Sequence, residues 1–269
     1  MDSNLTIGIL LTDHVVPKLI EKHGDQDEFY EYIFNKVDPS INLKIYDVVI
    51  DEYPNDIDEC DGYIITGSKL STYDDVDWIK TLEEYIRTLD ASKKNLLGVC
   101  FGHQLIAQAL GGKVEQAKVG WTLGIQPYNF LSEFPWVNNH NESVRLIHSH
   151  QDQVTELPVK AELIAKNDRV PVAMFRVGDH IMSMQGHPEF SEDYAHDVAN
   201  LRKEILGEKV SVITIDVSFI SLMLSLESVI AAAKPGCRLV ALVKPQFEVG
   251  REEVGKGGIV RNEAARDAA

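Results

Sequence analysis

The sequence predicts an α/β fold in which helices cover both faces of a doubly wound, mainly parallel sheet. Over the first 208 residues, short apolar runs bounded by turn residues alternate with segments whose apolar residues recur at helical spacing. In such sheets the functional loops follow the carboxyl ends of the strands. After residue 208 the composition changes abruptly, which predicts a second segment of different origin over residues 209–269.

The expected strands are short and rich in aliphatic residues. They span residues 6–11, 44–50, 61–66, 95–99, 145–148, 161–165, 172–175 and 180–184. The spacing of Trp78, Leu82, Ile86 and Leu89 predicts a helix over residues 77–89. A second helix is expected over residues 102–110, directly after the strand at 95–99, because Gly111-Gly112 closes it.

The composition excludes several protein classes. No apolar run reaches the roughly 18 residues that a membrane span needs, and the N-terminus does not resemble a signal peptide. Only 3 cysteines are present, which argues against a disulfide framework and for the reducing cytoplasm. A formal net charge of −16 disfavours nucleic acid and favours a small-molecule substrate.

The charge is divided unevenly along the chain. Residues 209–269 hold 8 Lys/Arg and 7 Asp/Glu, a balance of +1, so residues 1–208 hold 18 against 35, a balance of −17. All 9 His, 9 Tyr and 3 Trp also precede residue 209. This break predicts a join near residues 207–210, made by a fusion or by a gene-model splice.

Cys100 lies at a strand-to-helix turn between two glycines, Gly98 and Gly102. This pattern is typical of a nucleophile elbow with cysteine in place of serine, because the strained turn leaves no room for larger neighbours. A helix N-terminus also favours the thiolate. The alternative is an inert buried cysteine, and that is the expectation for Cys60 and Cys237, which have no such context.

A base for this nucleophile is offered by His187-Pro188-Glu189, after the strand expected at 180–184. A turn at Pro188 would bring the Glu189 carboxylate onto the His187 ring, which fixes the imidazole tautomer as the third member of a triad does. Alone, this tripeptide would equally suit an ordinary surface turn. Beside the cysteine elbow, it predicts a Cys100, His187 and Glu189 triad.

The two runs Gly98-Val99-Cys100-Phe101-Gly102-His103-Gln104 and Gln185-Gly186-His187-Pro188-Glu189-Phe190 resemble the signatures of class I glutamine amidotransferases. The resemblance covers residues 6–207 and implies a flavodoxin-like sheet with hydrolysis of a γ-glutamyl amide through a thioester, without cofactor or metal. By the same resemblance, Gly67, Ser68 and Phe101 would form the oxyanion hole, and Gln104, His150 and Gln151 would bind substrate.

Three functions remain open within this family resemblance. The domain could hydrolyse glutamine and pass ammonia to a separate synthetase subunit, since only 61 residues follow it and no phosphate loop is present. It could also act alone, like GMP-synthase-like amidotransferases, or cleave glutathione-like conjugates, like γ-glutamyl peptidases. A non-catalytic binding module is a further alternative. His140, His148 and His150 lack the companions expected of a metal site.

The C-terminal segment resembles a different family. Residues 214–222, 242–248 and 255–261 are similar to hemolysin-type ribosomal RNA 2′-O-methyltransferases of the FtsJ-like fold, and Asp216 and Lys244 match two of the four residues of that family's catalytic set. The other two, the S-adenosylmethionine loop and the RNA-binding domain have no counterpart. The segment is therefore expected to be a truncated Rossmann-like fragment without methyltransferase activity and without a nucleic-acid partner; a residual role related to RNA methyltransferases is the alternative.

Overall fold

The computed structural model describes residues 5–131 and 144–206, together with residues 210–215, 233–241, 244–245, 249, 254–255 and 259–264 of the C-terminal segment. The chain separates into two compact units, Met1–Asp197 and Val198–Ala269. The division expected from composition, at residue 208, stays a prediction. The first unit contains every residue of the expected triad.

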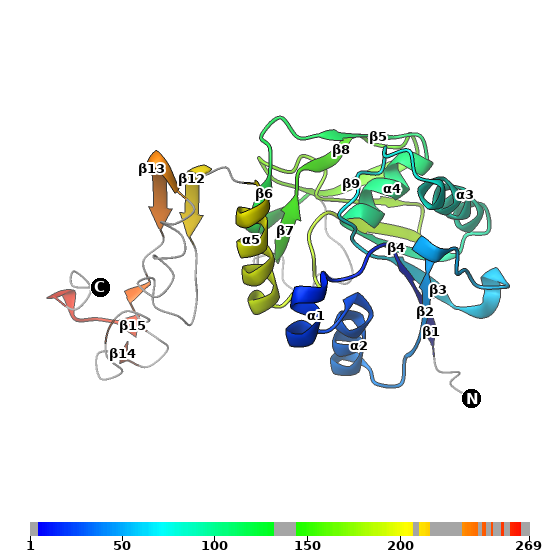
Figure 1. The fold of residues 1–269 in the computed structure, drawn as a ribbon, viewed down its shortest axis with the longest axis horizontal. Helices are drawn as coiled ribbons and strands as arrows, with labels where there is room; N and C mark the ends of the chain where they lie inside the picture. Colours follow the sequence, from blue (N-terminus) through cyan, green and yellow to red (C-terminus); the bar gives the residue numbers. More distant parts are fainter. Residues whose placement is uncertain are drawn as a thin grey trace. The chain divides into compact units, whose positions relative to one another are not determined.

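A nine-stranded sheet forms the centre of the first unit, in the order β2-β1-β3-β4-β11-β10-β9-β6-β7 (Figure 1). The five strands from β2 to β11 are parallel, and the pairings from β11 to β7 are antiparallel. The α/β class is confirmed, with a mixed sheet whose parallel half carries the expected site. These strands are β1 (Thr6–Leu11), β2 (Asn42–Asp47), β3 (Gly62–Ile65), β4 (Asn95–Val99), β6 (Thr122–Phe130), β7 (Val144–His150), β9 (Ala161–Lys166), β10 (Met174–Val177) and β11 (Ile181–Met184).

Helices pack on both faces of the parallel half because its strands are apolar on both sides. Leu10 and Ile65 face a core with Leu82 and Leu105 of the helices α3 and α4, whereas their neighbours in sequence face another core with Tyr30 of α2. This alternation follows from the two-residue period of a strand. The helices are α1 (Pro17–His23), α2 (Gln26–Val37), α3 (Asp77–Ala91), α4 (Phe101–Ala109) and α5 (Glu192–Leu206).

Short elements complete the first unit. β5 (Lys113–Gln116) and β8 (Asp152–Glu156) form a separate antiparallel pair. The strand expected over residues 44–50 ends at Asp47, and a 3₁₀ turn, Val48–Ile50, follows it. The expectation of a longer strand was wrong because Asp47 accepts a hydrogen bond from the N–H of Val49 at 3.1 Å and so starts the turn. A second 3₁₀ turn spans Ile57–Glu59.

In the C-terminal segment, β12 (Val210–Ile215) pairs in parallel with β13 (Ala233–Ala241). A second pair joins β14 (Val254–Gly255) to β15 (Ile259–Val260). Both pairs are separate from the nine-stranded sheet of the first unit. Asp216 lies outside the described residues.

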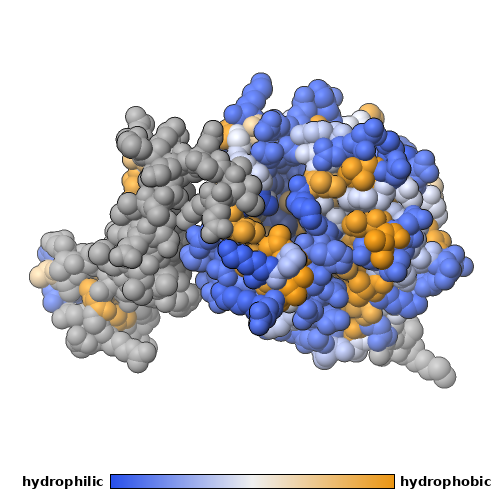
Figure 2. Space-filling model, viewed as in Figure 1, coloured by the Kyte–Doolittle hydropathy of each residue, from blue (hydrophilic) through white to orange (hydrophobic). Residues whose placement is uncertain are grey.

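The surface drawn in colour in Figure 2 is largely hydrophilic, with groups of apolar residues between hydrophilic ones. This agrees with the strongly acidic composition of the first 208 residues. Among the helices that the structure describes, none has both the length and the apolar character needed to cross a bilayer.

Candidate active site

The cysteine turn has the strained geometry of a nucleophile elbow. Cys100 immediately precedes α4 and has φ 54° and ψ −102°, a left-handed backbone conformation that non-glycine residues adopt rarely. A Cβ on Gly102 would lie 2.4 Å from the carbonyl oxygen of Ile65, and one on Gly98 would lie 2.7 Å from that of Gly102. Because the backbone approaches so closely, only glycine fits at these two positions, as the sequence pattern predicts.

The register of two neighbouring strands brings His187 to Cys100. Val99 of β4 pairs with Met184 of β11, and the Cys100 N–H donates to the Met184 carbonyl at 2.9 Å. Three residues later, His187 Nδ1 donates to Glu189 Oε1 at 2.7 Å. The Glu189 side chain is almost completely buried, and the His187 ring stacks on Phe190 with centroids 3.8 Å apart. The structure thus brings the three predicted triad residues together.

The charges around His187 decide its protonation. Burial lowers the pKa of His187, but the negative charges of Glu189 and Cys100, and the hydrogen bonds to both, raise it to about 10. His187 is therefore an imidazolium at neutral pH. A cationic ring beside Cys100 favours the thiolate, which is the nucleophilic form.

The loop after β3 lies on the other side of the elbow. A Cβ on Gly67 would lie 3.0 Å from Cε1 of His187 and 3.6 Å from Cβ of Cys100. The Gly67 carbonyl points away from the triad, because it accepts from the Thr12 hydroxyl at 3.0 Å and from Gln26 Nε2 at 3.1 Å. The Gly67 C=O and the Ser68 N–H belong to one trans peptide group, so they point in opposite directions. The Ser68 N–H is therefore directed toward the triad, which suits its predicted role in the oxyanion hole.

The second predicted oxyanion donor is the N–H of Phe101. It is the first residue of α4, and the first N–H groups of a helix have no carbonyl partner within the helix. They concentrate the positive end of the helix dipole beside the sulfur of the preceding residue. The roles of Gly67, Ser68 and Phe101 remain predictions that this geometry supports.

Two of the three predicted substrate-binding residues, Gln104 and His150, belong to a buried polar network, whereas Gln151 is only half-buried. Gln104 Nε2 donates to the Asp152 carbonyl at 2.7 Å and to Gln185 Oε1 at 3.1 Å, so both of its amide hydrogens are engaged. His150 Nδ1 donates to the same carbonyl at 2.9 Å. Gln151 Oε1 accepts from Gln116 at 3.3 Å. Substrate binding by Gln104, His150 and Gln151 stays a prediction. Because both amide hydrogens of Gln104 are engaged, its side-chain oxygen would be the atom that binds substrate.

Two further histidines are buried, and one of them, His148, is hydrogen-bonded to this network. Because a carbonyl can only accept, His150 carries its hydrogen on Nδ1, and its Nε2 accepts from His148 Nδ1 at 3.0 Å. Burial, reinforced by the charges of His150 and His187, holds the pKa of His148 well below its usual range. His103 contacts Ser183 Oγ at 2.9 Å, and burial lowers its pKa to about 3. His140 lies outside the described residues.

Sequence reasoning did not identify Thr12 or Gln26, whose side chains donate to the Gly67 carbonyl in the predicted oxyanion loop. Neither belongs to a motif: Thr12 follows β1, and Gln26 is the first residue of α2. For Thr12 the sequence did offer one signal, its position. A polar residue directly after a parallel strand lies at the edge of the sheet where functional sites form.

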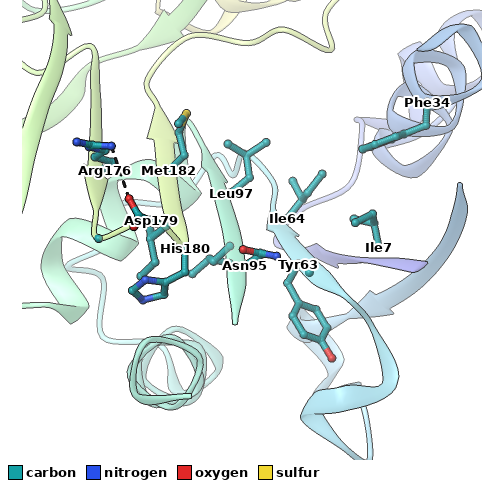
Figure 3. Close-up of a pocket in the computed structure, with 14 residues that line it drawn as sticks. Ile7, Phe34, Tyr63, Ile64, Asn95, Leu97, Arg176, Asp179, His180 and Met182 are labelled. Atoms are coloured by element: carbon teal, nitrogen blue, oxygen red, sulfur yellow. Dashed lines mark ion pairs between the residues drawn. The ribbon is translucent and has the colours of Figure 1, made fainter. Parts of the chain in front are cut away.

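A cavity of about 480 Å³ lies elsewhere in the first unit (Figure 3). It is lined by residues at the amino ends of β3, β4 and β11, among them Tyr63, Asn95 and Ile181, and by Phe34 of α2. No triad residue lines it. The amino ends of parallel strands are opposite to the edge that carries Cys100, so this cavity is not the candidate active site.

Comparison with known proteins agrees with the site. A family model for class I glutamine amidotransferases matches residues 31–206, well over half of the chain, and the chain belongs to this family. Gamma-glutamyl peptidase 3 of Arabidopsis thaliana is 35% identical over 164 residues, which are 58% of this chain and 66% of that protein. The chain spans about two thirds of the length of the curated peptidases it matches.

More distant relatives share the fold. One subunit of the glutamine-hydrolysing GMP synthase of Sulfolobus acidocaldarius is 27% identical over 161 residues, 60% of this chain and 84% of that subunit. A glutamine amidotransferase structure from Thermotoga maritima superimposes with a TM-score of 0.63 at 20% identity, covering 76% of this chain and 85% of that one.

The second resemblance seen in the sequence is also found. A family model for FtsJ-like methyltransferases matches residues 155–269, overlapping the amidotransferase match over residues 155–206. Two residues of this segment match the catalytic set of the methyltransferase family. The structure describes Lys244, whereas Asp216 lies outside the described residues.

Proposed function

We propose that this protein hydrolyses a γ-glutamyl amide bond, with Cys100 as nucleophile, His187 as general acid and base, and Glu189 as the residue that orients His187. The observation that carries this proposal is the assembled triad at a strained elbow, with His187 bonded to the buried Glu189 at 2.7 Å. Membership of the class I amidotransferase family supports it.

The chemistry follows from the positions of these groups. The Cys100 thiolate attacks the γ-carbonyl carbon, and the N–H groups of Ser68 and Phe101 stabilise the oxyanion. His187 then gives its proton to the leaving nitrogen, the C–N bond breaks, and a γ-glutamyl thioester remains. His187 next takes a proton from water, which attacks the thioester and releases a γ-carboxylate while the sulfur leaves as thiolate.

The leaving amine defines the substrate class. Glutamine would yield ammonia, and a γ-glutamyl peptide would yield a peptide or amino acid. Similarity to a peptidase at 35% identity, against 27% for the GMP synthase subunit, favours a γ-glutamyl peptide such as a glutathione-like conjugate. Glutamine hydrolysis with ammonia transfer to a separate synthetase is the second candidate, supported by the similarity to that GMP synthase.

One assay separates the two candidates. Purified protein is incubated with glutamine and, separately, with γ-glutamyl dipeptides, and kcat/KM is measured for glutamate release. A preference for dipeptides supports the peptidase, and a preference for glutamine supports the amidotransferase. Activity on neither, with Cys100 intact and reduced, would refute the proposal. We place the protein in the reducing cytoplasm because Cys60, Cys100 and Cys237 are all free thiols.

A further inference from the structure

One face of α2 is directed at the candidate active site. Gln26 and Tyr30 are four residues apart, so they share a helix face. Gln26 bonds to the Gly67 carbonyl, and Tyr30 packs in the same buried cluster as Cys100 and Val99. Both residues therefore reach the site from a helix that contains neither sequence motif.

Tyr30 and Glu189 each have an unused polar atom. The Tyr30 side chain is buried, and its hydroxyl has no hydrogen-bond partner among the described residues. Glu189 uses Oε1 for His187, while its buried Oε2 has no donor in the same part of the chain. Leaving buried polar atoms unpaired is costly, and a phenol donor matches a carboxylate acceptor.

Aromatic packing joins the two segments that carry Tyr30 and Glu189. Phe29, adjacent to Tyr30, contacts Phe190 with ring centroids 6.3 Å apart, and Phe190 is the residue after Glu189. Burial raises the pKa of Tyr30, and the negative charges of Glu189 and Cys100 raise it further. The phenol therefore keeps its hydrogen, and the charge of Glu189 acts on it.

We propose that Tyr30 is a positioning residue of the triad, whose hydroxyl donates a hydrogen bond to Oε2 of Glu189 and so fixes the carboxylate that orients His187. The two atoms are not bonded in the structure, so the proposal requires the Tyr30 hydroxyl to move toward Oε2; hydrogen bonds of catalytic groups are often long in the free enzyme. This inference rests on the proposed function, and Tyr30 acts through Glu189 without touching the substrate.

The test compares Tyr30→Phe with Tyr53→Phe. The Tyr53 hydroxyl is also buried and unpaired among the described residues, but Tyr53 packs with Tyr85 in the other core cluster. Tyr30→Phe should lower kcat about tenfold with little change in KM, the effect of one hydrogen bond to a charged group. The pH profile of kcat/KM should also shift, because the Glu189 charge that raises the pKa of His187 is then held less firmly in place. Tyr53→Phe should change neither.

Two further measurements keep the inference testable. In a Glu189→Gln background, Tyr30→Phe should have little additional effect, because both changes remove one interaction. The pH dependence of Cys100 alkylation by iodoacetamide needs no substrate and should shift in Tyr30→Phe alone. If the wild type hydrolyses no γ-glutamyl amide, the proposed function fails, and the alkylation profile still decides the role of Tyr30. Profiles of kcat/KM and alkylation that match the wild type in Tyr30→Phe would overturn the inference.

Discussion

Val99 and Met184 are register partners across the parallel strands β4 and β11, and this pairing sets Cys100 and His187 at the same edge of the sheet. The loop that carries Gly67 follows β3, the other neighbour of β4. Three adjacent strands thus present the proposed nucleophile, the proposed base and the predicted oxyanion loop side by side. The following predictions test this arrangement.

Replacement of Cys100 by alanine should lower γ-glutamyl amide hydrolysis by about 10³-fold or more, because no other nucleophile is available at the elbow. The melting temperature should change little, since alanine fills most of the same buried space. Cys60→Ala is the matched control: Cys60 is 1% exposed and remote from the elbow in the fold, so activity should persist. Near-wild-type rates in Cys100→Ala would refute the assignment of the nucleophile.

Activity should fall on the alkaline side as His187 loses its proton near its raised pKa of about 10, because the leaving nitrogen then receives no proton. Glu189→Gln removes one of the charges that raise this pKa, so the alkaline limb should move to lower pH. A pH profile of kcat for the two proteins measures this shift. An unchanged alkaline limb would show that Glu189 does not tune His187.

The raised pKa of His187 also makes the folding stability depend on pH. The pKa of His187 in the folded chain lies above the ordinary value of 6.5, so its stabilising contribution is complete below pH 6.5. It is lost as the pH rises from 6.5 toward about 10. Urea unfolding at pH 6 and pH 9 should show a larger loss of stability in the wild type than in His187→Gln. Equal losses in the two proteins would contradict this prediction.

Gly102→Ala should destabilise the protein and abolish activity, because the added methyl group would lie 2.4 Å from a backbone oxygen that has no room to move. Gly111→Ala is the control. There the methyl group meets no atom within 4 Å, and the left-handed φ of 91° costs only about 1 kcal/mol. Thermal unfolding and activity distinguish the two. Normal activity in Gly102→Ala would show that the elbow tolerates a larger residue.

Gln26→Glu should reduce kcat about tenfold or more, as expected when an oxyanion donor loses its orientation. The replacement keeps the shape but turns a donor into a charged acceptor facing the Gly67 carbonyl. Asn35→Ala, at an exposed position of the same helix, should have no effect. If Gln26→Glu lowers only the affinity for substrate and leaves kcat unchanged, the residue does not act through the oxyanion loop.

A chain that ends at Glu208 should fold and retain hydrolytic activity. All the residues proposed for the site precede position 190, and β12 and β13 pair with each other rather than with the nine-stranded sheet. Activity and melting behaviour of the shortened chain test this expectation. An unfolded or inactive product would show that the enzyme needs residues 209–269. Methyl transfer from S-adenosylmethionine to RNA by the full chain would contradict the expected inactivity of that segment.

The sequence by itself determined the elbow and the triad. Gly98, Cys100 and Gly102 are close in the chain, and the steric demands of one turn dictate all three, so the pattern is visible without a structure. His187 and Glu189 are likewise two residues apart. The strands at 6–11 and 95–99 were also predicted with their observed bounds, since short buried strands have a simple apolar pattern.

Only the tertiary structure decided what surrounds the triad. Thr12 follows β1, and Gln26 and Tyr30 belong to α2, far from either motif, so their contacts depend on strand order and helix packing. The same holds for Gln104 and His150, which share the Asp152 carbonyl as a hydrogen-bond acceptor. A local motif records the geometry of one turn, whereas contacts between distant segments exist only once the core has fixed their distances and directions.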